Sequence, residues 1–155
     1  SIHAMLNTRE RIVVGVNTEW RKLWEARFVD PLTDAESMLL DGNKILELGK
    51  KVSSMDEIQG QFTGLVKFSA AAAGEIWHRW GQDALNNPTN SPVSKLYMTD
   101  FIQGLIDGGD PVRAAFIGGD WLEVDSIEDL ELYEKMLQQD KLSMICSLDP
   151  KVFKE

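Results

Sequence analysis

An apolar stretch that ends in an acid and leads into a helix signal places the strongest constraint on the fold. Trp121 to Val124 has the composition of a short buried strand, Asp125 follows it, and Ser126 is a residue type that begins helices. Open α/β sheets bind ligands beside the carboxyl ends of their strands, so an acid at this junction indicates a functional site. A structural explanation is equally open, because Ser126 and Asp129 have the spacing of a capping box and Asp125 could itself be a cap.

Strand-like and helix-like segments alternate along the chain, which predicts an α/β fold with a mixed β-sheet flanked by helices. The expected strands are 11–16, 36–40, 44–48, 61–68, 112–117 and 121–124, with a hairpin at Asp41-Gly42-Asn43 and an antiparallel pairing of the last two. Four helices are expected. The first begins after Thr18 as N-cap, the second covers 70–85, and the third runs from Tyr97 to Ile106. The last has Ile127, Leu130, Tyr133 and Leu137 on its inward face. Segment 86–92 reads as a loop, and Leu142 to Leu148 as an edge strand or a surface cover.

Composition narrows the class of protein. A chain of 155 residues with 43% hydrophobic content can bury one ordinary core, so 1–155 is predicted to be a single domain. The balance of 16 basic against 25 acidic residues gives a net charge of −9, which disfavours nucleic-acid binding. No apolar stretch approaches the roughly 20 residues that cross a bilayer, so no membrane partner is expected. A lone Cys146 and the lack of an export signal favour the cytoplasm.

Five segments in chain order carry a family resemblance. They are DPLTDAE (30–36), KILELGKK (44–51), GQFTGLVKF (60–68), MTD (98–100) and WLEVDSIEDLELYEKM (121–136). They resemble the closing part of nucleotidyltransferases of the cytidylyltransferase and sugar-phosphate type, most closely those that activate phosphocholine or small phosphonates with CTP. The resemblance runs from about Val13 to Met136. It implies the carboxy-terminal portion of a Rossmann-like nucleotidyltransferase fold, without the G-x-G-x-R-x-x-P-K-type loop that holds the nucleotide's phosphates.

The resemblance also implies roles for particular residues. Lys50, or its neighbour Lys51, would face the acceptor's phosphate, which suits a flexible ammonium, although a solvated strand end explains the pair as well. Gly64 would let the acceptor approach the main chain, and the alternative is a simple bulge. Asp100 would be a further acceptor contact. Asp125 matches the family's second metal ligand, so Mg²⁺ is the expected cofactor; the customary partner aspartate belongs to the amino-terminal part, and no catalytic residue is assigned.

These features give two hypotheses of different classes. The first is a nucleotidyltransferase-like protein, derived from enzymes that transfer CMP or another nucleotide from an NTP to a small phosphorylated or phosphonate acceptor, and inactive alone because the phosphate-binding loop is absent. The second is a non-catalytic binding or assembly protein that self-associates. A homodimer is expected in either case, because strand 12–16 would have an unpaired edge without the amino-terminal strands. Hydrolase, zinc-protease, P-loop and C-x-x-C motifs are absent from the sequence.

Overall fold

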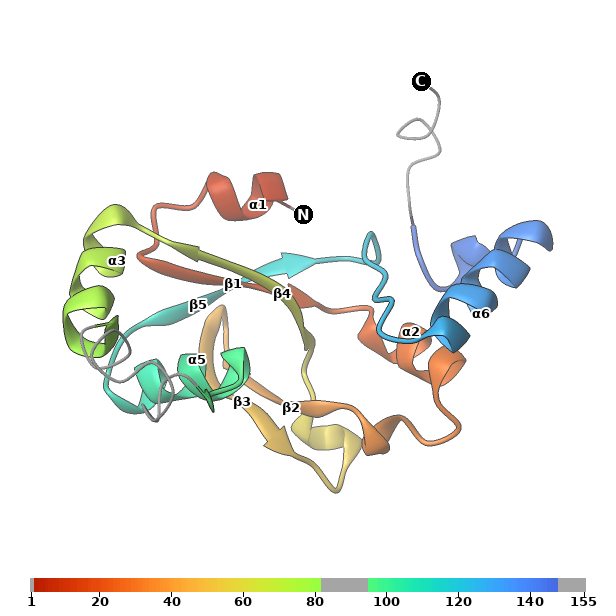
Figure 1. Ribbon diagram of the computed structural model, residues 1–155, viewed down its shortest axis with the longest axis horizontal. Helices are drawn as coiled ribbons and strands as arrows, with labels where there is room; N and C mark the ends of the chain where they lie inside the picture. The colour runs from red at the N-terminus through yellow and green to blue at the C-terminus, as the bar shows by residue number, and fades with distance from the viewer. Residues whose placement is uncertain (1, 82–94, 148–155) are drawn as a thin grey trace.

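A computed structural model describes residues 2–81 and 95–147 (Figure 1). One mixed sheet of five strands has the order β2-β3-β5-β1-β4. The strands are β1 (Ile12–Asn17), β2 (Glu36–Asp41), β3 (Lys44–Lys51), β4 (Gln61–Phe68) and β5 (Val112–Ile117). The α-helices are α1 (Ile2–Leu6), α2 (Trp20–Arg27), α3 (Ala70–Ile76), α5 (Met98–Asp107) and α6 (Ile127–Gln138). The predicted α/β fold with a mixed sheet flanked by helices is confirmed. No helix of the described segments is both long and apolar enough to cross a lipid bilayer.

Strand β1 lies inside the sheet, where it pairs in parallel with β5 and antiparallel with β4. All six of its residues are buried, as expected for a β-branched run that is covered on both faces. Strand 12–16 is therefore not an exposed edge, which corrects the reasoning behind the expected homodimer. The sheet instead ends in β2 on one side and β4 on the other.

The hairpin of β2 and β3 has the turn that the Asp-Gly dipeptide predicts. Gly42 adopts a φ of 59°, which costs a residue without a Cβ very little. The hairpin joins the sheet through β5, where Lys44 pairs with Arg113 and the Ala114 N–H donates to the Asn43 carbonyl at 2.7 Å.

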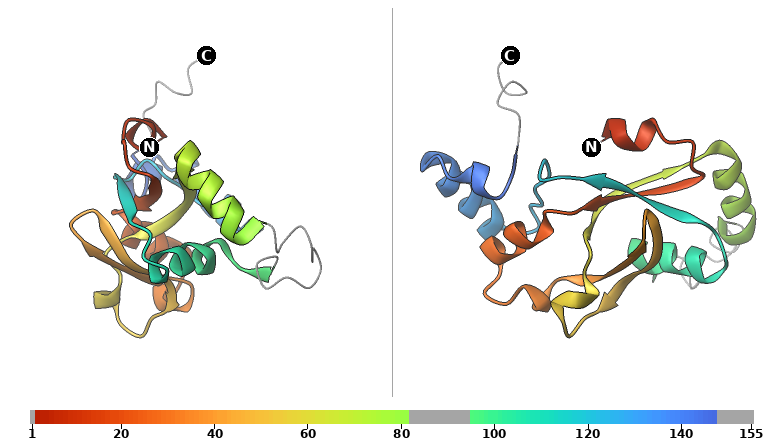
Figure 2. Two further views of the ribbon diagram at one scale, coloured as in Figure 1. Left: turned by 90° about the vertical axis from the view of Figure 1, so that its left-hand side faces the viewer. Right: turned by 180° about the vertical axis from the view of Figure 1, so that it is seen from behind.

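Apolar side chains gather in two main clusters at different places. In the first, α3 and α5 pack on one face of the sheet, and Figure 2 shows both helices on the same side. In the second, α2 and α6 pack against each other beyond the ends of β1 and β5, together with the short 3-10 turn Leu142–Met144. The opposite sheet face is covered by α1, through Met5. The buried members of the second cluster are Trp20, Leu23, Trp24, Ala35, Ile58, Tyr133, Ile145 and Cys146.

Several local expectations are wrong. Residues 121–125 form no strand, so the expected antiparallel pair with 112–117 does not exist. Thr18 does not cap α2; Glu19 holds the N-cap position, without a side-chain cap bond. The expected helix from Ala70 changes into a π-helical turn at Trp77–Gly81, and residues 82–94, with the expected loop 86–92, lie outside the described residues.

Of the four residues predicted to face inward from the last helix, Tyr133 is buried as expected and the other three are not. Ile127, Leu130 and Leu137 are exposed, whereas Asp129 and Tyr133 are buried and Leu132 and Met136 pack against the second cluster. Of the two alternatives for the tail that follows, the edge strand does not form among the described residues, and Ile145 and Cys146 are buried in the second cluster.

Candidate functional site

The two parallel strands end at the same edge of the sheet, and the chain continues from there into α2 and toward α6 (Figure 1). This is the crevice position at which open α/β sheets bind ligands. An open pocket of about 500 Å³ lies there. Its lining residues are Ala26, Arg27, Phe28, Asp34, Asp125, Ser126, Glu128, Asp129 and Leu132.

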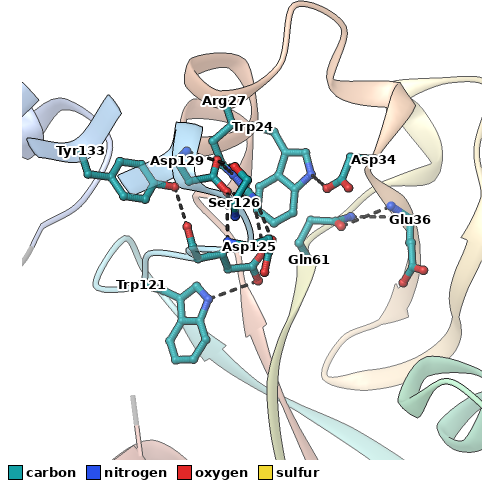
Figure 3. Close-up of polar contacts among 11 residues, drawn as sticks. Trp24, Arg27, Asp34, Glu36, Gln61, Trp121, Asp125, Ser126, Asp129 and Tyr133 are labelled. Atoms are coloured by element: carbon teal, nitrogen blue, oxygen red, sulfur yellow. Dashed lines mark hydrogen bonds and ion pairs between the residues drawn. The ribbon is translucent and has the colours of Figure 1, made fainter. Parts of the chain in front are cut away.

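Three carboxylates converge on one buried cation at this pocket (Figure 3). The side chain of Arg27 is only 2% exposed. Its Nε donates to Asp129 Oδ1 at 2.8 Å, and Nη2 donates to Asp125 Oδ2 at 2.6 Å and to Asp129 Oδ2 at 3.0 Å. Its Nη1 lies 3.3 Å from Glu123 Oε2. We call Arg27, Glu123, Asp125 and Asp129 the Arg27 cluster.

Local sequence features hold each member of the cluster in place. Arg27 is in the last turn of α2, with its guanidinium 5.4 Å from the Trp24 ring centroid and 4.9 Å from that of Phe28. Ser126 and Asp129 form the predicted capping box, and Asp129 Oδ2 also accepts the Asp125 N–H at 3.0 Å. The cap therefore fixes Asp129 against both Arg27 and the start of α6.

The cluster perturbs the protonation of its members. Hydrogen bonds from Arg27 lower the pKa of Asp129 to about 2, although burial opposes them. Burial raises the pKa of Glu123, and the charge of Asp125 adds to it, while the Trp121 indole and Arg27 oppose the change. Burial also raises the pKa of Tyr133 to about 12; its hydroxyl donates to the Glu123 carbonyl at 2.8 Å. At neutral pH, Asp129 is an anion bound to a cation.

A second group of acids continues from the pocket toward β2 (Figure 3). Asp34 accepts the Trp24 indole N–H at 3.1 Å, and the Glu36 backbone is held by the side chain of Gln61. Burial raises the pKa of Glu36, and the nearby charges of Asp100 and Asp34 add to the effect. These acids thus connect the pocket with the first turn of α5, where Asp100 lies.

Lys50 and Asp100 flank one contact between β3 and α5. A Cβ on Gly49, which has a φ of 84°, would lie 2.6 Å from the Thr99 side chain, so the backbones of the two elements approach closely there. Lys50 is exposed and forms an ion pair with Glu47, which raises the pKa of Lys50. Lys50 and Asp100 each lie one residue beyond this contact, next to Gly49 and Thr99 respectively.

Gly64 and Asp125 are placed differently. Gly64 lies in the edge strand β4 with a φ of 73°, opposite the register shift between Val14 and Val16, and no protein atom lies within 4 Å of the place its Cβ would take. Backbone conformation, as in a bulge, is therefore sufficient to explain the glycine. Asp125 is 69% exposed, and its Oδ2 is bonded to Arg27.

The residues present do not by themselves fit a magnesium ion. No group of three or more His, Cys, Asp or Glu residues in the described part of the chain is arranged to hold a metal. The three acids that do converge, Glu123, Asp125 and Asp129, share a guanidinium cation at their centre. Magnesium requires several oxygen ligands at short distance, and one exposed carboxylate supplies too few.

Sequence reasoning did not single out Arg27, the residue around which the site is built. The available signal was weak: a basic residue ends a helix whose Trp20, Leu23 and Trp24 face the core, one position before Phe28. Nothing in that local pattern reports acids about one hundred positions later.

Comparisons with known proteins agree with this architecture. No family model matches the chain. A CTP:phosphoglutamine cytidylyltransferase from Campylobacter jejuni is 37% identical over 134 residues, which cover 84% of this chain and 52% of that protein. The inositol-1-phosphate CTP transferase from T. maritima superposes with a TM-score of 0.55 at 20% identity, over 90% of this chain and 49% of the other. The chain thus spans about half the length of the curated relative that it matches, and it is similar to cytidylyltransferases over that half.

Proposed function

We propose that this chain forms the acceptor-binding side of a CTP-dependent nucleotidyltransferase, which transfers CMP to a small phosphorylated or phosphonate acceptor. We also propose that the chain alone does not catalyse the transfer. The observation that carries the first proposal is the 37% identity over 134 residues with a cytidylyltransferase. The similarity in fold to a second CTP transferase supports it. The names of both proteins contain CTP and a phosphorylated small molecule, which defines the acceptor class proposed here.

The proposed acceptor contacts are Lys50, Gly64 and Asp100. Support comes from the contact of β3 with α5, where Gly49 and Thr99, the chain neighbours of Lys50 and Asp100, approach closely. An exposed ammonium beside that contact can reach a phosphate oxygen, once it exchanges Glu47 for the ligand.

The cation that the described residues place at the site, Arg27, is already bound to three carboxylates, so the nucleotide's phosphates would need further cations. Magnesium is the proposed cofactor, and Asp125 the proposed ligand, on condition that substrate phosphates or further protein groups complete the coordination. The chemistry that the ion would supply is neutralisation of phosphate charge during attack on the α-phosphorus. The role of Arg27 is to hold the Asp125 carboxylate, through Nη2, at the rim of the pocket.

Acceptor binding is the direct test. The ligands are phosphoglutamine, inositol 1-phosphate and phosphocholine, each beside its dephosphorylated counterpart, in calorimetric titrations. We expect binding that depends on the phosphate and that weakens several-fold in Lys50→Gln. Lys22→Gln is the matched control, because Lys22 also forms an exposed ion pair three residues along its element, with Glu19. Equal weakening in both variants, or no binding of any phosphorylated ligand, would contradict the acceptor role.

The second proposal is tested by pyrophosphate release from CTP with magnesium and the same acceptors. We expect no turnover, because the phosphate-binding loop of such enzymes is not found in this sequence. Turnover that is lost in Asp125→Ala would show that the nucleotide site is complete in this chain.

A non-catalytic assembly protein is the second candidate function. The observation that favours it is the edge of β4, an eight-residue strand that pairs on one side only among the strands of residues 2–81 and 95–147. A homodimer that joins two such edges is the proposed assembly, because two-fold contacts are the commonest way in which soluble proteins cover an edge.

A further inference from the structure

A second pocket, of about 460 Å³, lies at the opposite end of the sheet from the Arg27 cluster, where β1 and β5 begin. Residues 8–10 pass over this end of the sheet and are held there by Lys67, whose Nζ donates to the Thr8 carbonyl at 2.6 Å. We call it the Arg113 pocket. Its lining residues are Thr8, Arg9, Glu10, Val13, Asn43, Arg113, Ala114, Ala115 and Phe116.

The guanidinium of Arg113 has more donors than partners. Arg113 carries five N–H donors, and its Nη1 donates to Asn43 Oδ1 at a long 3.4 Å. Its Nε is buried and has no hydrogen-bond partner within the described residues. The nearest acid is Glu10, whose Oε2 lies 4.0 Å from Nε and is too distant for a hydrogen bond. Buried donors in proteins nearly always have an acceptor, so an orphaned donor beside an open pocket indicates a missing acceptor.

The charges around the pocket are opposite to those of the whole chain. The chain has a net charge of −9, yet Glu10 is the one acid in the lining, against Arg9 and Arg113. Arg9 is exposed and forms no ion pair or side-chain hydrogen bond with another described residue. Lys44, which is exposed, pairs in register with Arg113 on the neighbouring strand and adds a third cation close by. Such a local excess of cations attracts an anion.

The donor set fits a tetrahedral oxyanion. Two guanidinium groups present planar pairs of N–H donors that match phosphate oxygens, and the Thr8 hydroxyl and the Asn43 amide add neutral donors. Val13, Ala115 and Phe116 supply an apolar side to the same pocket, with Phe116 47% exposed. An organic group attached to the phosphate could pack there.

We infer that the Arg113 pocket is a binding site for a phosphate monoester or inorganic phosphate. On binding, the guanidinium of Arg113 turns from its long contact with Asn43 toward the anion, so that its N–H donors gain acceptors. The carboxylate of Glu10 opposes binding, because it lies beside the same guanidinium and repels the anion. This site is separate from the proposed acceptor contacts and does not depend on the proposed nucleotidyl transfer.

The test is a titration of the ¹⁵N-labelled chain with inorganic phosphate at constant ionic strength, with chloride as the reference anion, followed by amide NMR shifts. We expect saturable shifts at residues 8–10, 43 and 113–116. Arg113→Gln should weaken binding by about tenfold or more, the factor expected for losing a charged hydrogen-bond donor. Arg9→Gln, at an exposed position, should also weaken it. Glu10→Gln should strengthen it, which a structural role of Glu10 does not predict.

Arg21→Gln is the matched control, because it removes one positive charge from an exposed position of α2. It should leave the phosphate affinity unchanged. A loss equal to that of Arg113→Gln, shifts of similar size with chloride, or weaker binding in Glu10→Gln would overturn the proposal and mean that only diffuse charge is sensed. Repeating the titration with glycerol 1-phosphate separates the two ligands: tighter binding than inorganic phosphate identifies a monoester site, and equal or weaker binding identifies a site for the free anion.

Discussion

At the scale of single residues, Arg27 is the cation that neutralises the three converging carboxylates of its cluster. Its side chain is 2% exposed and bonds to three carboxylates that come from a segment about one hundred positions away. Breaking a buried ion pair by removing one partner costs more than the pair contributes, because the remaining charge stays buried without compensation.

We therefore expect Arg27→Met to lower the free energy of unfolding by ~3–5 kcal/mol, even though methionine is apolar and similar in length. Arg21→Met, at an exposed position of the same helix, should change it by no more than about 0.5 kcal/mol. Urea unfolding of the two variants beside the wild type gives both values. Equal small losses would mean that the acids of the cluster are solvated and need no cation.

Asp129 should make stability depend on acid pH. Its folded-state pKa of about 2 lies below the ordinary 3.8, so its contribution is present above the unfolded value and disappears as the pH falls through the folded one. The depressed pKa corresponds to about 2 kcal/mol. We expect Asp129→Asn to be less stable than the wild type at pH 6, and the difference to shrink between pH ~4 and ~2. A difference that stays constant over this range would contradict the pKa. The raised pKa of Glu123 makes stability fall as the pH rises, and this contribution is present in the wild type and in Asp129→Asn alike.

At the scale of elements, local sequence predicts those segments whose own residue pattern is typical of one conformation. β4 has the predicted bounds, and the hairpin turn at Gly42 follows from the Asp-Gly dipeptide alone. On α6, Tyr133 is buried as predicted, whereas the other three apolar residues of the predicted face are exposed. Asp129, Leu132, Tyr133 and Met136 have the same helical spacing as the apolar set, and the choice between the two faces is made by Arg27, which lies outside the local sequence.

The same reason explains how far the candidate site could be predicted. An acid at a strand's end pointed to Asp125, and family resemblance pointed to Lys50 and Asp100, which do lie beside one contact. The strand expected at 121–124 does not form, and in this segment the carboxylate of Glu123 accepts hydrogen bonds from the Trp121 indole and from Arg27. Contacts of this kind depend on the tertiary fold, and no periodic pattern encodes them.

Two substitutions on α6 distinguish its faces. Leu137 is 63% exposed, so Leu137→Gln should change the free energy of unfolding by no more than about 0.5 kcal/mol. Met136→Gln places an amide in the second apolar cluster and should cost ~1–3 kcal/mol. Thermal or urea unfolding would reveal the opposite order if the helix presented the face that its sequence alone predicts.

At the scale of the whole molecule, the edge of β4 is the place where we expect two copies of the chain to associate. The Ser69 N–H donates to the carbonyl of Arg11, the residue directly before β1. Backbone N–H groups of an antiparallel strand point to alternate sides, so the N–H of Lys67 also points toward β1, and those of Val66 and Phe68 point away from it. An edge with free N–H groups can accept another strand, although the bulge at Gly64 and a lysine at position 67 limit such pairing.

We expect the chain to be a homodimer at micromolar concentration by light scattering. Val66→Pro removes an outward N–H without breaking a bond to β1, and it should shift the equilibrium toward monomer. Val66→Thr keeps the N–H and the branched shape, and it should remain dimeric. A wild-type monomer, or a dimer that both variants retain, would exclude β4 as the contact.

The position of the second apolar cluster, beyond the ends of the parallel strands, has a consequence for how the molecule opens. Its helices pack on each other and around Arg27, whereas the first cluster is built on the face of the sheet. The two regions can therefore lose their structure in separate steps, and amide hydrogen exchange should proceed faster in α2 and α6 than in β1. Local unfolding of α2 and α6 would separate the residues of the Arg27 cluster while the sheet stays folded. A ligand that binds at that pocket should therefore slow amide hydrogen exchange in these two helices.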